Sequence, residues 1–343
     1  LINEQFGTIP ELPKFTAKVI KTEEYRKSIK QVINIEINNN ESKNLNFKAT
    51  SYIIKNKKNL PTIICVGINT CNKNLIETSI ENDYNFITYE TEKLSPEIAD
   101  NPEEINHLKR IYKDYTWGDL AVRAWLGLIV TEYIKSIKGI DKNKLIVTGH
   151  SRNGKVALIL GIINTEFIIT NPVNSGITGV NAVKFYGYKS NDLAYLTNPN
   201  RYHYWYTKNF SKKYSRNEKK MLFDSHFQLA LVSPRNLLIQ ISGDLWDNPI
   251  GGQIAYEGAL PVYKLMKAED NLSISFTETG HKHTSVHIKD LINYANYKFE
   301  KKERLNEYKK LKFSRIDKIK TLIYSRFKMS RYKIVKTVKS IIY

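Results

Sequence analysis

A serine on a predicted tight turn is the residue of this chain best suited to nucleophilic chemistry. Ser151 lies in the string Gly-His-Ser-Arg-Asn-Gly-Lys over residues 149–155. A serine hydroxyl is a weak nucleophile at its own pKa, so it needs a positioned base, an acid that orients the base, and donors for an oxyanion. The chain offers His281 as the base and Asp244 as the acid, each directly after a glycine. These residues predict hydrolysis through an acyl-enzyme.

Other residues compete for two of these roles. Asp247 follows the preferred acid by three residues and is the alternative acid, while His283 and His287 are alternative bases. Both histidines are less well placed than the one in the Gly-His turn. We expect His150 and His226 to orient or pack, because neither follows a strand end in the position of the base.

The elements around these residues support the assignment. Residues 144–148 form a short β-branched run that leads into the serine turn, and the small-residue segment 156–158 follows it. Strands are predicted at 237–241 and 273–276, so the acid and the histidine each follow a strand end. A strand, a sharp turn with the serine, and a helix form the context of the nucleophile elbow, and the chain order serine, acid, histidine is that of α/β-hydrolases.

The rest of the chain alternates strands and helices. We predict a helix capped by Thr116, with Asp119 three residues on and a stop near Gly139, and another helix over 254–266. Further strands are predicted at 33–37, 49–54, 61–68 and 85–89. The pattern predicts an α/β-hydrolase with a mostly parallel, doubly wound sheet in a three-layer sandwich. We place this domain at residues 1–300 and a basic, helical C-terminal tail at 301–343.

The charge is concentrated in that tail. The chain of 343 residues has a net charge of +19, and residues 301–343 hold fifteen Lys or Arg against three Asp or Glu, a net charge of +12. A local excess argues against nucleic acid as a partner. Such a basic stretch can lie on an anionic membrane or acidic polysaccharide, or it can be a solvated linking helix. Its apolar residues recur at near-helical spacing: Ile316, Ile319, Ile323, Phe327, Ile334 and Val338.

The cysteines and the first residue of the chain bear on disulfides, metal binding and the compartment. Cys65 and Cys71 are too few for a disulfide scaffold and have no Cys or His companions at zinc spacing, so we expect two ordinary thiols and no metal. No run of eighteen apolar residues exists. The chain begins at Leu1 without Met, so the compartment stays open: secreted or cell-envelope if a leader preceded this residue, otherwise cytoplasmic.

The serine string resembles the nucleophile motif of the glucuronoyl esterases, carbohydrate esterase family 15. Lipases and peptidases do not carry Ser-Arg-x-Gly-Lys, so this resemblance is specific, and it runs from about residue 60 to 300. Further matching segments are Trp117-Gly118, Tyr204-Trp205-Tyr206, Asp224-Ser225-His226, Asp244-Leu245-Trp246 and Gly280-His281-Lys282-His283. The resemblance implies that Arg152 serves the oxyanion, that Lys155 bonds a uronate hydroxyl and that Trp246 packs against the sugar.

One position departs from the family. Many members place a catalytic Glu 23 residues after the serine, within Glu-Ser-Gly, whereas this chain has Asn174-Ser175-Gly176 there. An amide cannot stabilise an imidazolium as a carboxylate does. Either Asp244 takes over or activity is impaired, and we favour Asp244.

Three functions follow in order of preference. The first is a serine esterase that opens a 4-O-methyl-glucuronoyl or glucuronoyl ester of a uronic-acid glycan with Ser151, His281 and Asp244, without metal or organic cofactor. The second is an acetyl esterase of a bacterial surface polysaccharide. The third is a non-catalytic hydrolase-like protein that binds carbohydrate or a partner.

Overall fold

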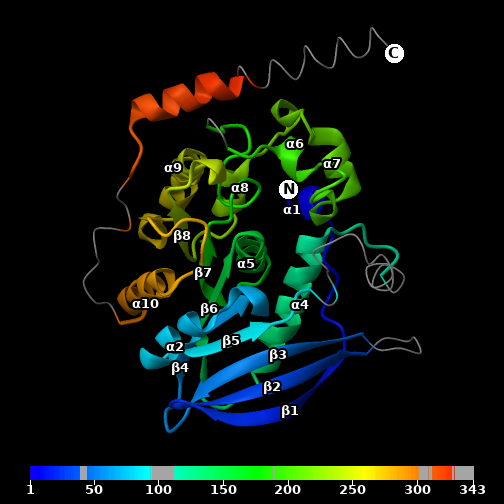
Figure 1. Ribbon diagram of the computed structural model, residues 1–343, viewed down its shortest axis with the longest axis vertical. Coiled ribbons are helices and arrows are strands. Elements are labelled where there is room, and N and C mark those ends of the chain that lie inside the picture. Colours follow the sequence, from blue (N-terminus) through cyan, green and yellow to red (C-terminus); the bar gives the residue numbers. More distant parts are fainter. Residues whose placement is uncertain are drawn as a thin grey trace.

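The computed structural model describes residues 1–38, 45–92, 94, 112–187, 190–300, 308, 311–326 and 328. Within these ranges nine strands form one sheet in the order β1-β2-β3-β5-β4-β6-β7-β8-β9 (Figure 1). The pairs from β1 to β5 are antiparallel and those from β5 to β9 are parallel. The strands are β1 (Phe15–Tyr25), β2 (Ser28–Ile37), β3 (Leu45–Ile54), β4 (Leu60–Val66), β5 (Asn85–Tyr89), β6 (Ile140–His150), β7 (Phe167–Val173), β8 (Asn236–Ser242) and β9 (Leu272–Thr277).

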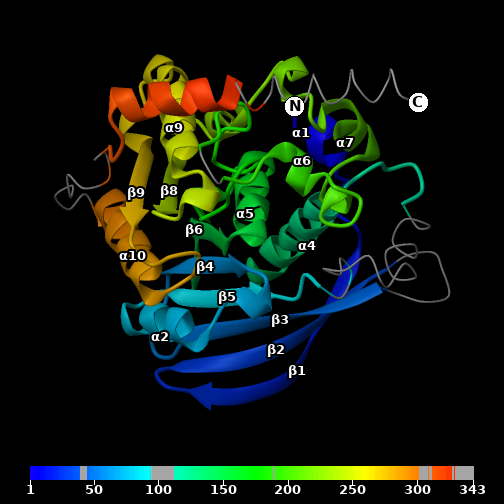
Figure 2. The ribbon, with the colours of Figure 1, turned by 45° about the horizontal axis from the view of Figure 1, so that its top comes forward.

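Helices cover both faces of this sheet, as the two views in Figure 1 and Figure 2 show. One face carries α2 (Lys73–Glu81) and α10 (Ser285–Glu300), whose apolar residues share a buried cluster. The other carries α4 (Asp119–Ile134), α5 (Arg152–Ile163), α8 (Ser225–Ala230) and α9 (Pro249–Leu265). Three further helices are short: α1 (Ile2–Phe6), α6 (Leu193–Leu196) and α7 (Lys208–Tyr214). The predicted three-layer α/β architecture is confirmed.

The seven predicted strands are all present, two further strands were not anticipated, and the predicted cap is wrong. Neither β1 nor β7 was predicted, and α4 begins at Asp119 behind Gly118, without a side-chain cap from Thr116. The Asp119 carboxylate instead accepts a hydrogen bond of 2.8 Å from Nε of the fully buried Arg123. A buried guanidinium needs such a carboxylate partner.

The two cysteines form a disulfide, which corrects the expectation of free thiols. Cys65 lies in β4, and a 3-10 turn at Ile68–Thr70 reverses the chain so that its Cα comes within 6.4 Å of that of Cys71. Counting cysteines missed the pair because the reversal depends on local turn geometry. The disulfide closes the loop that carries Thr70 to the edge of the sheet.

Part of the predicted tail has a defined place. Residues 315–326 are helical, and this helix lies across α9 at the surface (Figure 2). The predicted helical positions Phe327, Ile334 and Val338 lie outside the described residues. Across the described ranges, no helix combines the length and the apolar character that crossing a membrane requires.

Candidate active site

The predicted elbow is formed by the end of β6 and the start of α5. Ser151 lies between them with φ of 57° and ψ of −120°, a strained turn for a residue with a side chain. Both glycines of the string are required by close backbone approaches. A Cβ on Gly149 would come within 2.2 Å of the carbonyl oxygen of Asn153, and one on Gly154 within 2.8 Å of that of Val173.

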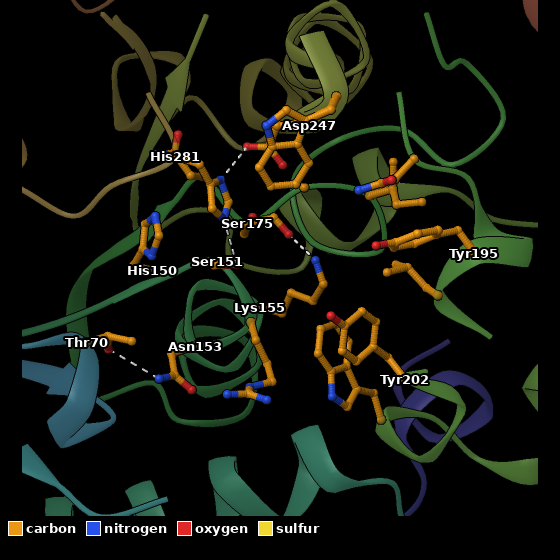
Figure 3. A pocket seen from close by; sticks show the side chains of 18 residues that line it. Thr70, His150, Ser151, Asn153, Lys155, Ser175, Tyr195, Tyr202, Asp247 and His281 are labelled. Atoms are coloured by element: carbon orange, nitrogen blue, oxygen red, sulfur yellow. Dashed lines mark hydrogen bonds and ion pairs between the residues drawn. The ribbon is translucent and has the colours of Figure 1, made fainter. Parts of the chain in front are cut away.

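The serine faces the predicted histidine. Ser151 Oγ and His281 Nε2 are 2.9 Å apart (Figure 3), although the two residues are 130 positions apart in the sequence. His281 follows β9 on the turn after Gly280, which has φ of 63°. At this distance the imidazole can accept the hydroxyl proton directly.

The carboxylate on the other side of the imidazole is Asp247, the alternative acid. Its Oδ2 is 3.6 Å from His281 Nδ1, which is an ion-pair distance and too long for a hydrogen bond. The preferred Asp244 lies beside Gly280 instead, where a Cβ on that glycine would be 3.6 Å from Asp244 Oδ2. A 3-10 turn at Leu245–Asp247 carries the later aspartate toward the histidine. Of the two aspartates, Asp247 is therefore the one whose carboxylate lies near the imidazole.

Burial governs the titration of Asp247. The residue is 4% exposed, and this burial raises the pKa of its carboxyl above the usual range. His281 and the ammonium of Lys155 act in the opposite direction and favour the charged form. The two cationic neighbours therefore offset the burial only in part, and the pKa of Asp247 stays raised.

Asn174, where the resemblance implied a Glu, has a structural role in this arrangement. The side chain is 1% exposed, and its Oδ1 accepts a 2.6 Å hydrogen bond from the backbone N–H of Ser242. Its Nδ2 donates to the carbonyl oxygens of Gly280 and Lys282, at 3.4 and 3.5 Å. The amide therefore joins the ends of β7 and β8 to the loop that carries His281.

The other histidines do not compete with His281 for the serine. His150 packs on His281 with ring centroids 4.6 Å apart, and burial lowers the pKa of His150 to about 3. His283 stacks on His150 with ring centroids 5.8 Å apart, and burial keeps the pKa of His283 well below the ordinary value. His287 bonds to threonine hydroxyls, and burial lowers its pKa to about 4. His226 lies away from the serine, beside Gly258 of α9.

Two cations from the first turn of α5 border the serine. The Arg152 guanidinium lies 5.6 Å from the Trp205 ring centroid, and burial lowers its pKa. Its backbone N–H lies at the first position of α5, directly after Ser151. Lys155 is 5% exposed, donates to the carbonyl oxygen of Ser175, and has a pKa lowered by burial to about 8.

These residues line a cavity of about 600 Å³ that also has an aromatic wall (Figure 3). Trp246 is 41% exposed, and its ring centroid is 4.4 Å from that of His281. Tyr202 stacks on Trp205 at 4.4 Å, with Tyr195 beside it. The two tyrosines were not predicted as site residues, because they lie in a segment of short helices and turns without a periodic pattern. Within the described ranges, no group of His, Cys, Asp or Glu is suited to hold a metal ion.

The comparison with protein families identifies one match. The family described as "Glucuronyl esterase, fungi" matches residues 35–267, which is more than half of the chain. Among curated proteins, a prokaryotic "Carbohydrate esterase MZ0003" is 32% identical over 151 residues, covering 44% of this chain and 34% of that protein. A 4-O-methyl-glucuronoyl methylesterase from Thermothelomyces thermophilus is 27% identical over 198 residues, covering 54% of this chain and 49% of the relative. The matches thus span one third to one half of these relatives.

Solved structures share the fold over most of the chain. A family 15 glucuronoyl esterase from Caldicellulosiruptor kristjansonii superposes with a TM-score of 0.76 at 20% identity, covering 91% of this chain and 86% of that one. A glucuronoyl esterase from Sporotrichum thermophile, solved as a serine-to-alanine mutant with methyl 4-O-methyl-β-D-glucopyranuronate, has a TM-score of 0.69 at 19% identity, with coverages of 97% and 87%.

Proposed function

Because this chain belongs to the glucuronoyl esterase family, we propose that it is a serine esterase that hydrolyses glucuronoyl or 4-O-methyl-glucuronoyl esters of a glycan. The observation that carries the proposal is the 2.9 Å approach of Ser151 Oγ to His281 Nε2 inside a cavity of about 600 Å³. A buried carboxylate, that of Asp247, lies behind the histidine. The site therefore has a nucleophile, a base, an orienting acid and room for a sugar.

The reaction proceeds through an acyl-enzyme. Ser151 Oγ attacks the ester carbonyl carbon while His281 Nε2 accepts its proton, and Asp247 stabilises the imidazolium that forms. The negative charge on the carbonyl oxygen is met by the N–H of Arg152 and by its guanidinium. His281 then protonates the leaving alcohol. Water, deprotonated by the same imidazole, attacks the acyl-enzyme and releases the uronic acid.

The lining of the cavity favours a uronate as the acyl group. Among its described lining residues the charged side chains near the serine are two cations, Arg152 and Lys155, and the carboxylate of Asp247, which faces the histidine. The carboxylate that ester hydrolysis releases is an anion, and the cations stabilise it, whereas the choice of a uronate rests on the room for a sugar. Trp246 offers an exposed face beside His281 on which a pyranose ring can pack.

The test is an assay of purified protein with benzyl glucuronate and methyl 4-O-methyl-glucuronate as substrates. We expect hydrolysis by the natural sequence and its loss in Ser151→Ala. A fluorophosphonate probe should label the natural sequence and fail to label the alanine variant. Hydrolysis at an undiminished rate by Ser151→Ala would refute the proposed nucleophile.

The same preparation discriminates the two other hypotheses. Release of acetate from an acetylated polysaccharide, without release of alcohol from the glucuronate esters, would favour an acetyl esterase. Absence of probe labelling together with intact glycan binding would favour a non-catalytic protein. Asn174 prompted that last hypothesis, but Asp247 supplies a carboxylate to the histidine without it.

A further inference from the structure

The helix at residues 315–326 is attached to the domain by its polar side. Ser325, which is fully buried, bonds through Oγ to the backbone N–H and carbonyl of Tyr186 at 2.8 and 2.9 Å. Lys318 Nζ lies 2.8 Å from both carboxylate oxygens of Glu257 on α9. Just before the helix, the side-chain amide of Gln253 bonds to the backbone of residues 312 and 313. The helix is therefore held in one orientation.

That orientation leaves its apolar side in solvent. Ile316, Ile319 and Ile323 are 64, 46 and 63% exposed. At 100° per residue these three lie within 60° of one another, opposite the buried Thr321 and Ser325. An ordinary surface helix of a globular protein buries such a stripe and exposes its polar residues. This helix does the reverse, so its isoleucines need an apolar environment outside the domain.

The charges beside the stripe indicate what provides that environment. The exposed cations Arg315 and Lys320 flank the isoleucine stripe, one along each of its two edges. Residues 301–343 together carry fifteen Lys or Arg against three Asp or Glu. We propose that the outer face of the 315–326 helix binds in the plane of an anionic phospholipid bilayer, with the isoleucines at the acyl boundary and the cations at the headgroups.

Other occupants fit these observations less well. An acidic polysaccharide would neutralise the cations but leave three isoleucines in water. A second copy of this chain would bring its most basic segment against itself, which like-charge repulsion opposes. A bilayer with anionic headgroups satisfies both the apolar stripe and the charge.

The experiment is flotation of the full chain with vesicles of phosphatidylcholine alone or with 30 mol% phosphatidylglycerol. We expect it to float with the anionic vesicles, to float less at 0.5 M NaCl, and to remain behind with phosphatidylcholine alone. The variant Ile316→Ser/Ile319→Ser/Ile323→Ser should lose about tenfold or more of its partitioning. The charge variant Arg315→Gln/Lys320→Gln should lose partitioning and most of its salt dependence.

A matched control separates the helix from exposed apolar residues in general. Leu12, Ile20 and Val286 are 46, 51 and 51% exposed, and Ile20 lies on β1, at the end of the molecule opposite the helix (Figure 1). The variant Leu12→Ser/Ile20→Ser/Val286→Ser should float like the natural sequence. All variants should keep their melting temperature and fluorophosphonate labelling of Ser151, so that loss of folding is detected independently.

Several results would overturn the proposal. One is the absence of flotation of the natural sequence with anionic vesicles. Another is equal flotation of the triple isoleucine variant. A dimer seen by light scattering that dissociates in that variant, without vesicle binding, would assign the stripe to a second copy. Retention on polygalacturonate that depends on the cations alone, without vesicle binding, would assign the tail to polysaccharide.

Discussion

Replacing Asp247 by Asn gives the sharpest test of the proposed catalytic site. The change keeps the size of a buried side chain that is 4% exposed but removes the charge 3.6 Å from His281 Nδ1. Two unit charges at this distance interact by about 5 kcal/mol at an effective dielectric constant of about 20, the value suited to partly shielded sites. That stabilisation is present only when the imidazole is protonated in the transition state. We therefore expect kcat/KM to fall by about 10³-fold.

The matched control is Asp244→Asn, three residues earlier on the same turn. Its carboxylate lies beside Gly280 rather than at the imidazole, so we expect a loss of less than about threefold. Both variants should be measured on benzyl glucuronate, with fluorophosphonate labelling as a second readout of Ser151 reactivity. A large loss in Asp244→Asn together with a small one in Asp247→Asn would refute the assignment of the acid and restore our preference from the sequence.

Three further predictions concern Lys155, the disulfide and Asn174. Burial lowers the pKa of Lys155 to about 8 from an ordinary value near 10.5, so between these two pH values the unfolded chain binds more protons than the folded chain. The free energy of unfolding should therefore rise with pH over this range. Urea titrations should show this rise, and the rise should be smaller in Lys155→Met. Replacing both Cys65 and Cys71 by Ser should lower the free energy of unfolding by about 2 kcal/mol, a modest loss because the loop that the disulfide closes is short. An unchanged free energy of unfolding in urea titrations without reductant would contradict the pairing. Asn174→Leu should reduce kcat more than it changes KM and lower stability by about 3 kcal/mol, because three hydrogen bonds to strand ends and the histidine loop are lost. A variant with unchanged kcat on benzyl glucuronate would show that the amide does not position His281.

The parts of the fold that follow local patterns were predictable. The run at 144–148 and the glycines around Ser151 are sufficient to place the elbow, because β-branched residues favour a strand and the turn tolerates no Cβ at its glycines. By contrast, β7 contains Asn171 and Pro172, which are unfavourable in a central strand. Asn171 is accepted there because its side chain bonds to Thr148 and to the carbonyl of Leu238. Such compensation between distant residues leaves no signal in a local pattern.

The sequence could not show which aspartate, Asp244 or Asp247, lies near His281, for a similar reason. Both follow β8 within five residues, and chain order cannot distinguish them. The outcome depends on a 3-10 turn and on Asn248, which adopts the left-handed conformation with φ of 58°. The aromatic wall of the cavity could not be predicted either, because Tyr195 and Tyr202 reach the cavity from a segment of short helices and turns.

The place of Asn174 beside the histidine loop follows from where parallel strands end. The strands β7, β8 and β9 are neighbours, so their carboxyl ends bring Asn174, Asp247 and His281 to one edge of the sheet. A carboxylate from either of the first two ends can therefore serve the same imidazole. Here the loop after β8 supplies the carboxylate, that of Asp247, and burial already raises the pKa of this group. A second carboxylate after β7 would repel the first and raise the free-energy cost of burying its charge. A neutral amide avoids that repulsion and can donate to the histidine loop, which a carboxylate cannot do.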